Sequence, residues 1–584
     1  MSLLEQASLV LIPSGYKEDT VYSVIPSNGS GDLSFTRASD GTRINSDGLV
    51  EVTPWNLFQQ SETFENASWT KNNISVATGI GTTPEGLPYR ILTNTVNGFN
   101  SLTQTPPLIV NSFYSVTIVL KKGTAISVGF RVGAGTWGDA KYNFDTDAFV
   151  GSGVAFASRR FLGDGWIEIK YQNFEALQTN FRVFISSSTT GNSLDGLIGQ
   201  TLLVSKMQIS IGSTAKPYFP TTDRLNVPRL TYQNGGGGCP SLLLEPQRTN
   251  LALYSQEFDN AYWPKLNSTI TANSLTSPDG TVTADKLIAD ATTNLHRINI
   301  SVFTGVALTS NTLSIFAKKG EYNFFYFRES ISGTTVETFF DLNNGTITSI
   351  GAGRTATITS FGNGWYKCSV TATSVTMNFG IGFGVAQTDG VSSFLGNGTS
   401  GIYLWGAQLE AGAYASSYIP TTSASATRIA DACSKTGISS LIGQTEGVLF
   451  AEFIPSKTTD VVNLSANGVF QTDLNISYDA NNKRIGINFY VNPTYIIAYF
   501  SANNSALLNT KIKVAVAYKS GDLAIYINGV QTNTSTTTYT IVSQLTRIRF
   551  NQNNFTGSDS ILYNQVILFP TRLTNAELAL ITTL

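Results

Sequence analysis

The sequence predicts an all-β chain built from tandem antiparallel β-sandwiches. Its 584 residues exceed the roughly 250 to 300 residues that one hydrophobic core can organise, so several domains are expected. Charged residues make up only 13% and hydrophobic residues 41%, so Ser, Thr, Asn and Gly must cover much of the surface. These residues, with 24 Tyr and 34 Phe, suit short strands and tight turns better than long helices. An internal repeat indicates that two of the domains are copies of one fold.

Two stretches of the chain match each other closely. NLFQQSETFENASWTK begins at Asn56, NLALYSQEFDNAYWPK begins at Asn250, and eight of their sixteen positions are identical. The match continues through Lys-Lys-Gly at 121–123 and 318–320, Gly-Trp at 165–166 and 364–365, and Pro-Thr-Thr at 220–222 and 420–422. Paired landmarks at nearly constant offset demand equivalent places in one fold. We therefore predict that residues 56–222 and 250–422 are the same jelly-roll-like sandwich, with the same strand order.

The C-terminal part, residues 423–584, lacks these landmarks and predicts a third sandwich. From Lys511 it reads KIKVAVAYKSGDLAIYINGVQ. Two strands flank Ser520-Gly521-Asp522, and a hairpin is predicted at Asn528-Gly529, because these residues tolerate the positive φ that a two-residue turn requires.

Two segments lie outside the sandwiches predicted in this way. Residues 223–249 contain four consecutive glycines at 235–238, and such a run holds regular structure only at a high entropic cost. We therefore predict a Gly-rich linker there, at a domain boundary or hinge. Residues 1–55 form an N-terminal segment before the first copy.

Several of these stretches resemble known phage proteins. The segment from Lys511, with the closing QVILFPTRLTNAELALI, resembles the concanavalin A-like, laminin-G-like sandwich domains of phage and bacterial surface proteins. Upstream, IPSGYKEDTVYSVIP, GDLSFTRASDGTRINSDGLVE, CPSLLLEPQRTNLALYSQEFDNAYW and WGAQLEAGAYASSYIPTT resemble structural proteins of tailed bacteriophages and prophages. Those proteins are similar to virion fibres and to head or tail appendages, and they often have carbohydrate-binding-module-like domains.

The resemblance implies a non-enzymatic structural and adhesive subunit of a virion. By class, such a subunit is expected to be a homotrimer, to dock onto capsid or tail proteins through residues 1–55, and to attach to host surface glycans. Residue Glu5 stands where a secretion signal needs positive charge, so we expect no signal peptide. A virion protein assembles in the host cytoplasm, leaves by lysis and needs none.

Charge and hydropathy disfavour two other classes of protein. The formal net charge is −2 and the basic residues are scattered, so no basic stripe predicts binding to nucleic acid. No run approaches 18 apolar residues, so we expect no membrane-spanning helix. The three cysteines, Cys239, Cys368 and Cys433, are far apart and have no CxxC spacing, so neither a disulfide framework nor a zinc site is predicted.

Enzymatic function is not predicted either. The chain has one histidine, His296, so an HExxH zinc site is impossible, and we interpret this residue as a strand histidine without a catalytic role. A glycoside hydrolase needs only two carboxylates, but the ExDxxE strand of concanavalin A-like glucanases is absent. Two alternatives stay open: a free glycan-binding lectin of a bacterial surface, and a capsular polysaccharide depolymerase.

The remaining candidate sites are a polar segment and one tryptophan. Asp473, Asn475 and Asp479 could supply oxygen ligands to calcium, but an ordinary polar turn explains them without metal, and we predict no cofactor. Trp69 and Trp263 are paired across the repeat, as core residues would be. Trp137 lies in GAGTWGD, which has no counterpart in the second copy, so it is the predicted ligand-binding aromatic residue.

Overall fold

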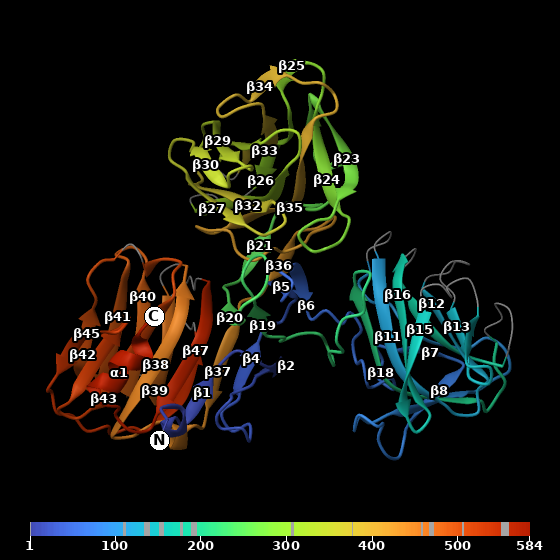
Figure 1. Cartoon of the computed structure of the whole chain (residues 1–584), viewed down its shortest axis with the longest axis horizontal. Helices are drawn as coiled ribbons and strands as arrows, with labels where there is room; N and C mark the ends of the chain where they lie inside the picture. Colours follow the sequence, from blue (N-terminus) through green and yellow to red (C-terminus); the bar gives the residue numbers. More distant parts are fainter. Residues whose placement is uncertain are drawn as a thin grey trace. The chain divides into compact units, whose positions relative to one another are not determined.

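The computed structural model of the chain describes residues 2–108, 113–132, 140–150, 157–175, 179–187, 195–304, 309–375, 378–456, 459–466, 472–504, 507–550 and 560–584. Its strands form antiparallel sheets (Figure 1), which confirms the predicted class of tandem β-sandwiches. The chain divides into two compact units, Val52–Leu225, and Met1–Glu51 together with Asn226–Leu584. No helix in the described residues is long and apolar enough to cross a membrane.

The unit Val52–Leu225 is a sandwich of two six-stranded sheets. In order across the sheet, the first contains β14 (Ala148–Val150), β13 (Ala140–Asn143), β12 (Ser127–Val132), β17 (Phe181–Ser186), β10 (Ser101–Gln104) and β7 (Thr70–Asn72). The second contains β15 (Ala157–Gly163), β16 (Trp166–Glu175), β11 (Phe113–Lys122), β18 (Thr201–Ile211), β9 (Arg90–Asn94) and β8 (Ile74–Thr78). Apolar side chains of both sheets meet in one core.

The second copy has the same architecture. Its first sheet contains β30 (Thr346–Ser349), β29 (Val336–Asp341), β28 (Phe324–Glu329), β33 (Asn378–Ala386), β26 (Arg297–Thr304) and β22 (Lys265–Leu266). Its second contains β31 (Thr355–Ser360), β32 (Trp365–Thr373), β27 (Ser310–Lys319), β35 (Gly401–Ala411), β24 (Ala284–Ala289) and β23 (Ser268–Leu275). Strand for strand, this is the order of the first copy, as the repeat predicted. Two short pairs are added, β25 (Thr293–Leu295) with β34 (Ser393–Leu395), and β21 (Arg248–Asn250) with β36 (Ala426–Arg428).

A buried asparagine explains why the repeat begins with Asn-Leu. The Asn56 side chain donates to the carbonyls of Met207 (3.3 Å) and Phe219 (2.9 Å) and accepts from the backbone amides of Phe58 and Ile209. In the second copy Asn250 makes the same four hydrogen bonds, with Ala407, Ile419, Ala252 and Leu409. Each asparagine therefore fastens the closing Pro-Thr-Thr segment of its copy to the long strand before it.

The third sandwich has one sheet built around β38 and β47 and another built around β39 to β42. The first contains β19 (Arg229–Thr231), β20 (Ser241–Leu244), β47 (Ile561–Phe569), β38 (Glu446–Pro455), β43 (Ile512–Lys519), β44 (Leu523–Ile527) and β45 (Val530–Ser535), with β1 (Leu9–Leu11) also pairing β47. The second contains β2 (Tyr16–Lys17), β3 (Thr20–Val21), β4 (Leu33–Thr36), β37 (Ala432–Thr436), β46 (Leu545–Phe550), β39 (Thr459–Ala466), β40 (Thr472–Asp479), β41 (Arg484–Val491) and β42 (Thr494–Phe500).

Local sequence explains the ends of this sandwich. Asn528 has a φ of 47° and Gly529 a φ of 83° in the two-residue turn between β44 and β45, which confirms the predicted hairpin. The helix α1 (Asn575–Thr582) begins with a capping box of Thr574 and Glu577. Its Leu578 packs on the outer face of the sheet that contains β38 and β43. Two 3-10 turns, η1 (Leu4–Gln6) and η3 (Ser439–Leu441), complete the helical structure of the described residues.

The N-terminal segment is part of the third sandwich rather than a separate piece. The sequence predicts that residues 1–55 are a docking segment before the first sandwich. In the structure, β1 pairs β47 and β4 pairs β37. Leu9, Leu11 and Phe35 belong to the main core of the sandwich. Strands this short cannot bury their apolar side chains alone, so they complete an existing sheet.

The segment predicted as a linker, residues 223–249, also differs from the expectation. Its strands β19 and β20 pair with each other, and β20 pairs β47. The four glycines form the loop between β19 and β20 and all have positive φ. A Cβ on Gly236 would lie 2.7 Å from the carbonyl oxygen of Ser46, so glycine permits a close backbone contact with the turn between β5 (Gly41–Ile44) and β6 (Val50–Thr53).

We predict that Trp69→Ala and Trp263→Ala each destabilise their own sandwich by about 3–5 kcal/mol, the usual cost of deleting a large buried aromatic side chain. Both residues are almost fully buried. Each indole donates to a backbone carbonyl at 3.0 Å, that of Gln60 and that of Tyr254 respectively. Chemical denaturation measures the effect, and Ile80→Ala, at a side chain that is 96% exposed, is the matched control. Loss of ligand binding with unchanged stability would contradict a core role.

Candidate binding site

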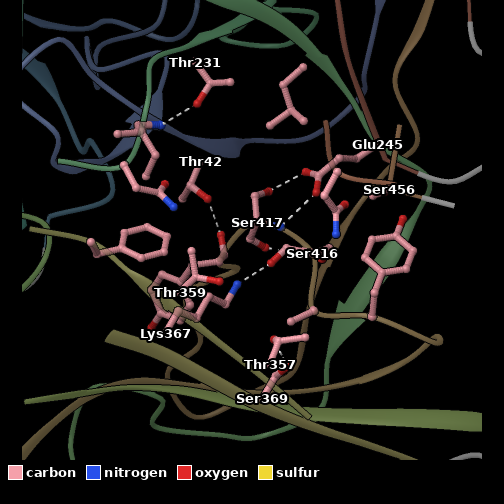
Figure 2. A pocket seen from close by; sticks show the side chains of 18 of the residues that line it. Thr42, Thr231, Glu245, Thr357, Thr359, Lys367, Ser369, Ser416, Ser417 and Ser456 are labelled. Carbon is pink, nitrogen blue, oxygen red and sulfur yellow. Dashed lines mark hydrogen bonds between the residues drawn. The ribbon is translucent and has the colours of Figure 1, made fainter. Parts of the chain in front are cut away.

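A pocket of about 680 Å³ lies within the unit that contains the second copy and the third sandwich (Figure 2). Four parts of the chain line it: the β5–β6 ribbon, the strands β19 and β20, the sheet edge β31–β32 with the loop 413–418, and the third sandwich at Ser456, Leu508, Asn509 and Leu562. Its volume lies within the range of about 300–1,000 Å³ that is common for small-molecule sites.

One wall of the pocket is a ladder of hydroxyl groups. Thr355, Thr357 and Thr359 occupy every second position of β31, and they are register partners of Thr371, Ser369 and Lys367 on β32. Since successive side chains of a strand point to opposite faces, the alternate residues Ile358 and Cys368 pack toward the core.

The hydroxyl groups of the ladder differ in whether they already have a hydrogen-bond partner. Those of Thr357 and Ser369 are hydrogen-bonded to each other at 2.6 Å (Figure 2). The hydroxyls of Thr355 and Thr359 have no hydrogen-bond partner among the described residues, and both side chains are exposed to the pocket.

Lys367 carries a positive charge into the same wall. Its Nζ donates to the carbonyl of Ser416 at 2.5 Å, and it lies 5.7 Å from the centre of the Phe316 ring. Burial lowers the pKa of Lys367, while attraction to Glu410 and Glu245 opposes that shift. No carboxylate of the described residues comes within 4.0 Å of this ammonium group.

Aromatic rings supply apolar surface. The rings of Phe316 and Phe361 both line the pocket and meet edge to face, with centroids 4.8 Å apart. Tyr414 lies at the opposite side, where its hydroxyl accepts a hydrogen bond from the Ser560 amide at 2.9 Å and Arg248 stacks over its ring at 5.3 Å. The pocket thus combines hydroxyls, aromatic side chains and the cationic side chains of Lys367 and Arg43.

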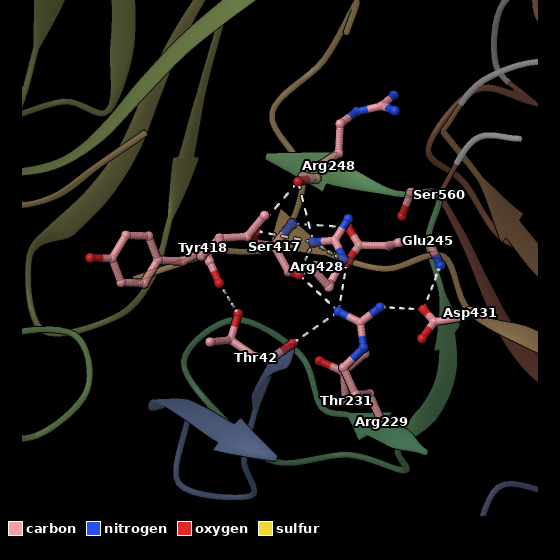
Figure 3. Close-up of polar contacts among 12 residues, drawn as sticks. Thr42, Arg229, Thr231, Glu245, Arg248, Ser417, Tyr418, Arg428, Asp431 and Ser560 are labelled. Carbon is pink, nitrogen blue, oxygen red and sulfur yellow. Dashed lines mark hydrogen bonds and ion pairs between the residues drawn. The ribbon is translucent and has the colours of Figure 1, made fainter. Parts of the chain in front are cut away.

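A buried ion cluster (Figure 3) shares Glu245 with the lining of the pocket. Arg229 contacts both Glu245, at 2.6 Å, and Asp431, while Arg37 pairs with Asp431 at 2.9 Å and Arg428 with Glu245 at 3.0 Å. All five side chains are at most 2% exposed. These residues come from three distant segments of the chain, so the cluster joins the N-terminal segment, β19–β20, and the segment between the second copy and the third sandwich.

The backbone completes the cluster. The Ser417 amide and hydroxyl both donate to Glu245, at 2.9 and 2.5 Å. The Glu245 amide donates to Asp431 at 2.8 Å. The Thr42 hydroxyl donates to the Tyr418 carbonyl at 2.5 Å, so the β5 strand is tied to the same loop.

Burial and charge pairing shift the pKa values of the cluster residues in opposite directions. Burial would raise the pKa of Glu245, but Arg428 and Arg229 outweigh it and hold that pKa well below its usual range. Burial lowers the pKa of Arg37 to about 10 despite its pairing with Asp431. Three arginines face these two carboxylates, and the buried Glu410 lies beside them, where it accepts from the Ser416 hydroxyl at 2.6 Å.

Trp137, the predicted ligand-binding residue, lies outside the described residues. His296 does not line the pocket. It is fully buried between β25 and β26, with Nδ1 2.6 Å from the Asn267 carbonyl oxygen and Nε2 3.0 Å from that of Phe394. It therefore makes structural contacts with the start of β23 and with β34.

The possible calcium ligands do not converge. Asp479 accepts from the backbone amides of Asn481 and Asn482 and from Arg484, which confirms an ordinary polar turn. Asp473 is bonded to Asn463 instead, at 2.7 Å. Within the described residues, no group of three or more His, Cys, Asp or Glu side chains is placed to hold a metal ion.

Sequence reasoning missed the residues of the pocket. One signal was present: the segment after the shared Gly-Trp reads IEIK in the first copy and YKCS in the second. Glu168 of the first copy thus corresponds to Lys367, because Trp166 pairs Lys121 as Trp365 pairs Lys318. A reversed charge at an equivalent position is a signal that the two copies differ in function. The ion cluster, by contrast, depends on long-range contacts that no local pattern indicates.

No family model matches the chain, and no curated protein matches it. Among solved structures, the chain is similar to the receptor binding domain of botulinum neurotoxin C/D mosaic serotype, with 13% identity and a TM-score of 0.23, over 26% of this chain and 40% of that one. It is also similar to a heptameric SAP-like pentraxin from Limulus polyphemus (13% identity, TM-score 0.19, 24% of this chain and 70% of that one).

A third similar structure is the galectin LEC-6 of Caenorhabditis elegans, with 12% identity and a TM-score of 0.18, over 23% of this chain and 88% of that one. The chain thus spans about two fifths of the botulinum neurotoxin structure. With TM-scores below 0.5, these likenesses carry no argument about a ligand.

We predict that Glu245→Gln destabilises the unit that contains it by about 3–5 kcal/mol, because it leaves buried arginines without their counter-charge. Glu446→Gln removes the partner of Lys519 in a more exposed pair, 3.0 Å apart, and is expected to change stability by about 0.5 kcal/mol or less. Chemical denaturation of both variants measures the difference. Equal, small effects would show that the cluster adds little to stability.

We also predict that acid destabilises this unit through Glu245. Because its pKa in the folded state is lowered from the ordinary value of 4.5, its stabilising effect is complete above that value and is lost as the pH falls below it. The free energy of unfolding should therefore begin to drop at about pH 5 and keep dropping as the pH falls further, and less steeply in Glu245→Gln. An identical pH dependence in both proteins would contradict this assignment.

Proposed function

We propose that the chain is a non-enzymatic structural and adhesive subunit of a tailed-bacteriophage virion, a fibre or an appendage. The observation that carries the proposal is the buried ion cluster, which couples sequence-distant segments of one unit. A projecting subunit needs such coupling, since each joint between domains would otherwise bend under load. The phage-like motifs supply part of it: Arg37 lies in the GDLSFTRAS stretch and Glu245 in the CPSLLLEP stretch.

An adhesive role is supported by the chemistry of the pocket. Threonine and serine hydroxyls can hydrogen-bond sugar hydroxyls, and the partly exposed Phe361 ring offers apolar contact. A pocket of this kind binds modestly by itself. Many copies on one particle multiply such binding, because the second contact forms at high effective concentration.

Docking onto capsid or tail proteins is proposed for the N-terminal segment even though its strands belong to the third sandwich. Leu4, Ile12, Tyr22 and Val24 are between 36% and 48% exposed. Exposed apolar side chains close together in sequence are typical of a protein–protein contact. We propose a homotrimer, which is the usual state of fibre subunits.

Imaging of particles tests the virion assignment. We expect particles from an infected or induced culture to contain the protein in stoichiometric amounts, and an affinity label on it to appear at the head or the tail in electron micrographs. Its absence from purified particles, with free protein in the lysate, would contradict the proposal and favour a free lectin.

A second test asks whether the protein hydrolyses polysaccharide and whether its glycan binding needs a metal ion. We expect purified protein to release no reducing ends from host capsular polysaccharide and to keep any glycan binding in the presence of a chelator. Reducing ends that disappear on replacement of one carboxylate would favour a depolymerase. Binding that is lost on chelation would favour a calcium-dependent lectin.

A further inference from the structure

We infer that the pocket beside β31 and β32 binds a saccharide that carries a carboxylate group, with Lys367 as the residue that selects the acid. This inference rests on the proposed adhesive function and names the class of ligand. It depends on three features of the pocket: the charge of its walls, the arrangement of its hydroxyls and the position of its rings.

The charge of the pocket favours an anion. Three charged side chains line it, Arg43, Glu245 and Lys367. Arg43 is paired with Glu51 at 2.8 Å, and Glu245 is held by two arginines. Lys367 alone of the three has no carboxylate within 4.0 Å among the described residues, although Glu410 and Glu245 attract it from farther away. An anionic group of a ligand would therefore form the close ion pair that Lys367 lacks, in a partly desolvated site.

The hydroxyl ladder favours a sugar over a simple anion. Consecutive threonines of β31 are two residues apart, so their side chains follow one another at about 6.5–7 Å. Thr359, whose hydroxyl has no partner, is directly opposite Lys367 in the register. A sugar ring with its carboxylate on Lys367 would thus reach Thr359 with one hydroxyl and Thr357 or Thr355 with others.

The aromatic rings complete the specificity. Phe316 lies beside Lys367 and packs edge to face on Phe361. Phe316 is buried, so the partly exposed Phe361 ring supplies the apolar surface for the C–H face of a sugar, while Lys367 binds its acid group. The first copy lacks this combination, because Glu168 stands at the position of Lys367 and pairs with Arg160 at 3.3 Å. We therefore assign acidic-sugar binding to the second copy only.

Binding measurements on the full-length protein test the inference. The probes are a galacturonate trisaccharide, the neutral galactose trisaccharide and galactose 6-phosphate, titrated by calorimetry at low and moderate salt. We expect the galacturonate trisaccharide to bind most tightly, by about tenfold over the neutral sugar. Equal binding of acidic and neutral sugars, or preference for the phosphate, would overturn the assignment.

Variants locate the site. Lys367→Gln should weaken galacturonate binding by about tenfold to a hundredfold and leave neutral-sugar binding nearly unchanged. Lys319→Gln removes the same charge from an exposed lysine of the same sandwich and should have no effect. Thr359→Val keeps shape and charge and should weaken the binding of both sugars by a similar, smaller factor. Unchanged galacturonate affinity in folded Lys367→Gln, or in Thr359→Val if the lysine variant fails to fold, would overturn the inference.

The two proposals fail separately. Protein found on particles that binds no galacturonate would retain the structural role and reject the acidic ligand. Protein absent from particles that binds galacturonate through Lys367 would retain the site and reject the virion assignment.

Discussion

The structure of the larger unit depends on the burial of five charged side chains in one cluster. Taking Arg37, Arg229 and Arg428 out of water is costly, and this cost is offset because Glu245, Asp431 and surrounding carbonyl groups bind their terminal guanidinium nitrogens. Such a cluster tolerates few alternative arrangements. The cluster therefore selects one arrangement of the segments that it joins, and it also contributes to stability.

The candidate pocket is a consequence of that assembly. The loop 413–418 is held by Ser417 on Glu245 and by Thr42 on the Tyr418 carbonyl. This loop in turn positions the Ser416 carbonyl that accepts from Lys367. The hydroxyl ladder needs no such support, because it is an ordinary strand face. The chemistry of the pocket thus arises where a regular sheet meets an irregular, ion-held junction.

Much of the fold could be predicted from the sequence. Asn56 and Asn250, with the landmarks that follow them, predicted two identical strand orders, and Asn528-Gly529 predicted a hairpin, because these signals are local or repeated. The role of the glycines at 235–238 could not be predicted, since the close contact with Ser46 joins segments far apart in sequence. The same holds for Glu245 and Asp431, whose partners are 16 to 394 residues away. Trp137 lies outside the described residues and stays a prediction from its loop sequence.

We expect the cluster to limit local unfolding of the segments around it as strongly as a hydrophobic core does. Hydrogen exchange followed by mass spectrometry tests it most directly, on peptides that cover residues 241–250 and 413–431. The account predicts that amides at Glu245, Ser417 and Asp431, all hydrogen-bonded, exchange as slowly as those of β38 and β43. Exchange at the rate of exposed loops, in a protein whose sandwich strands stay protected, would contradict it.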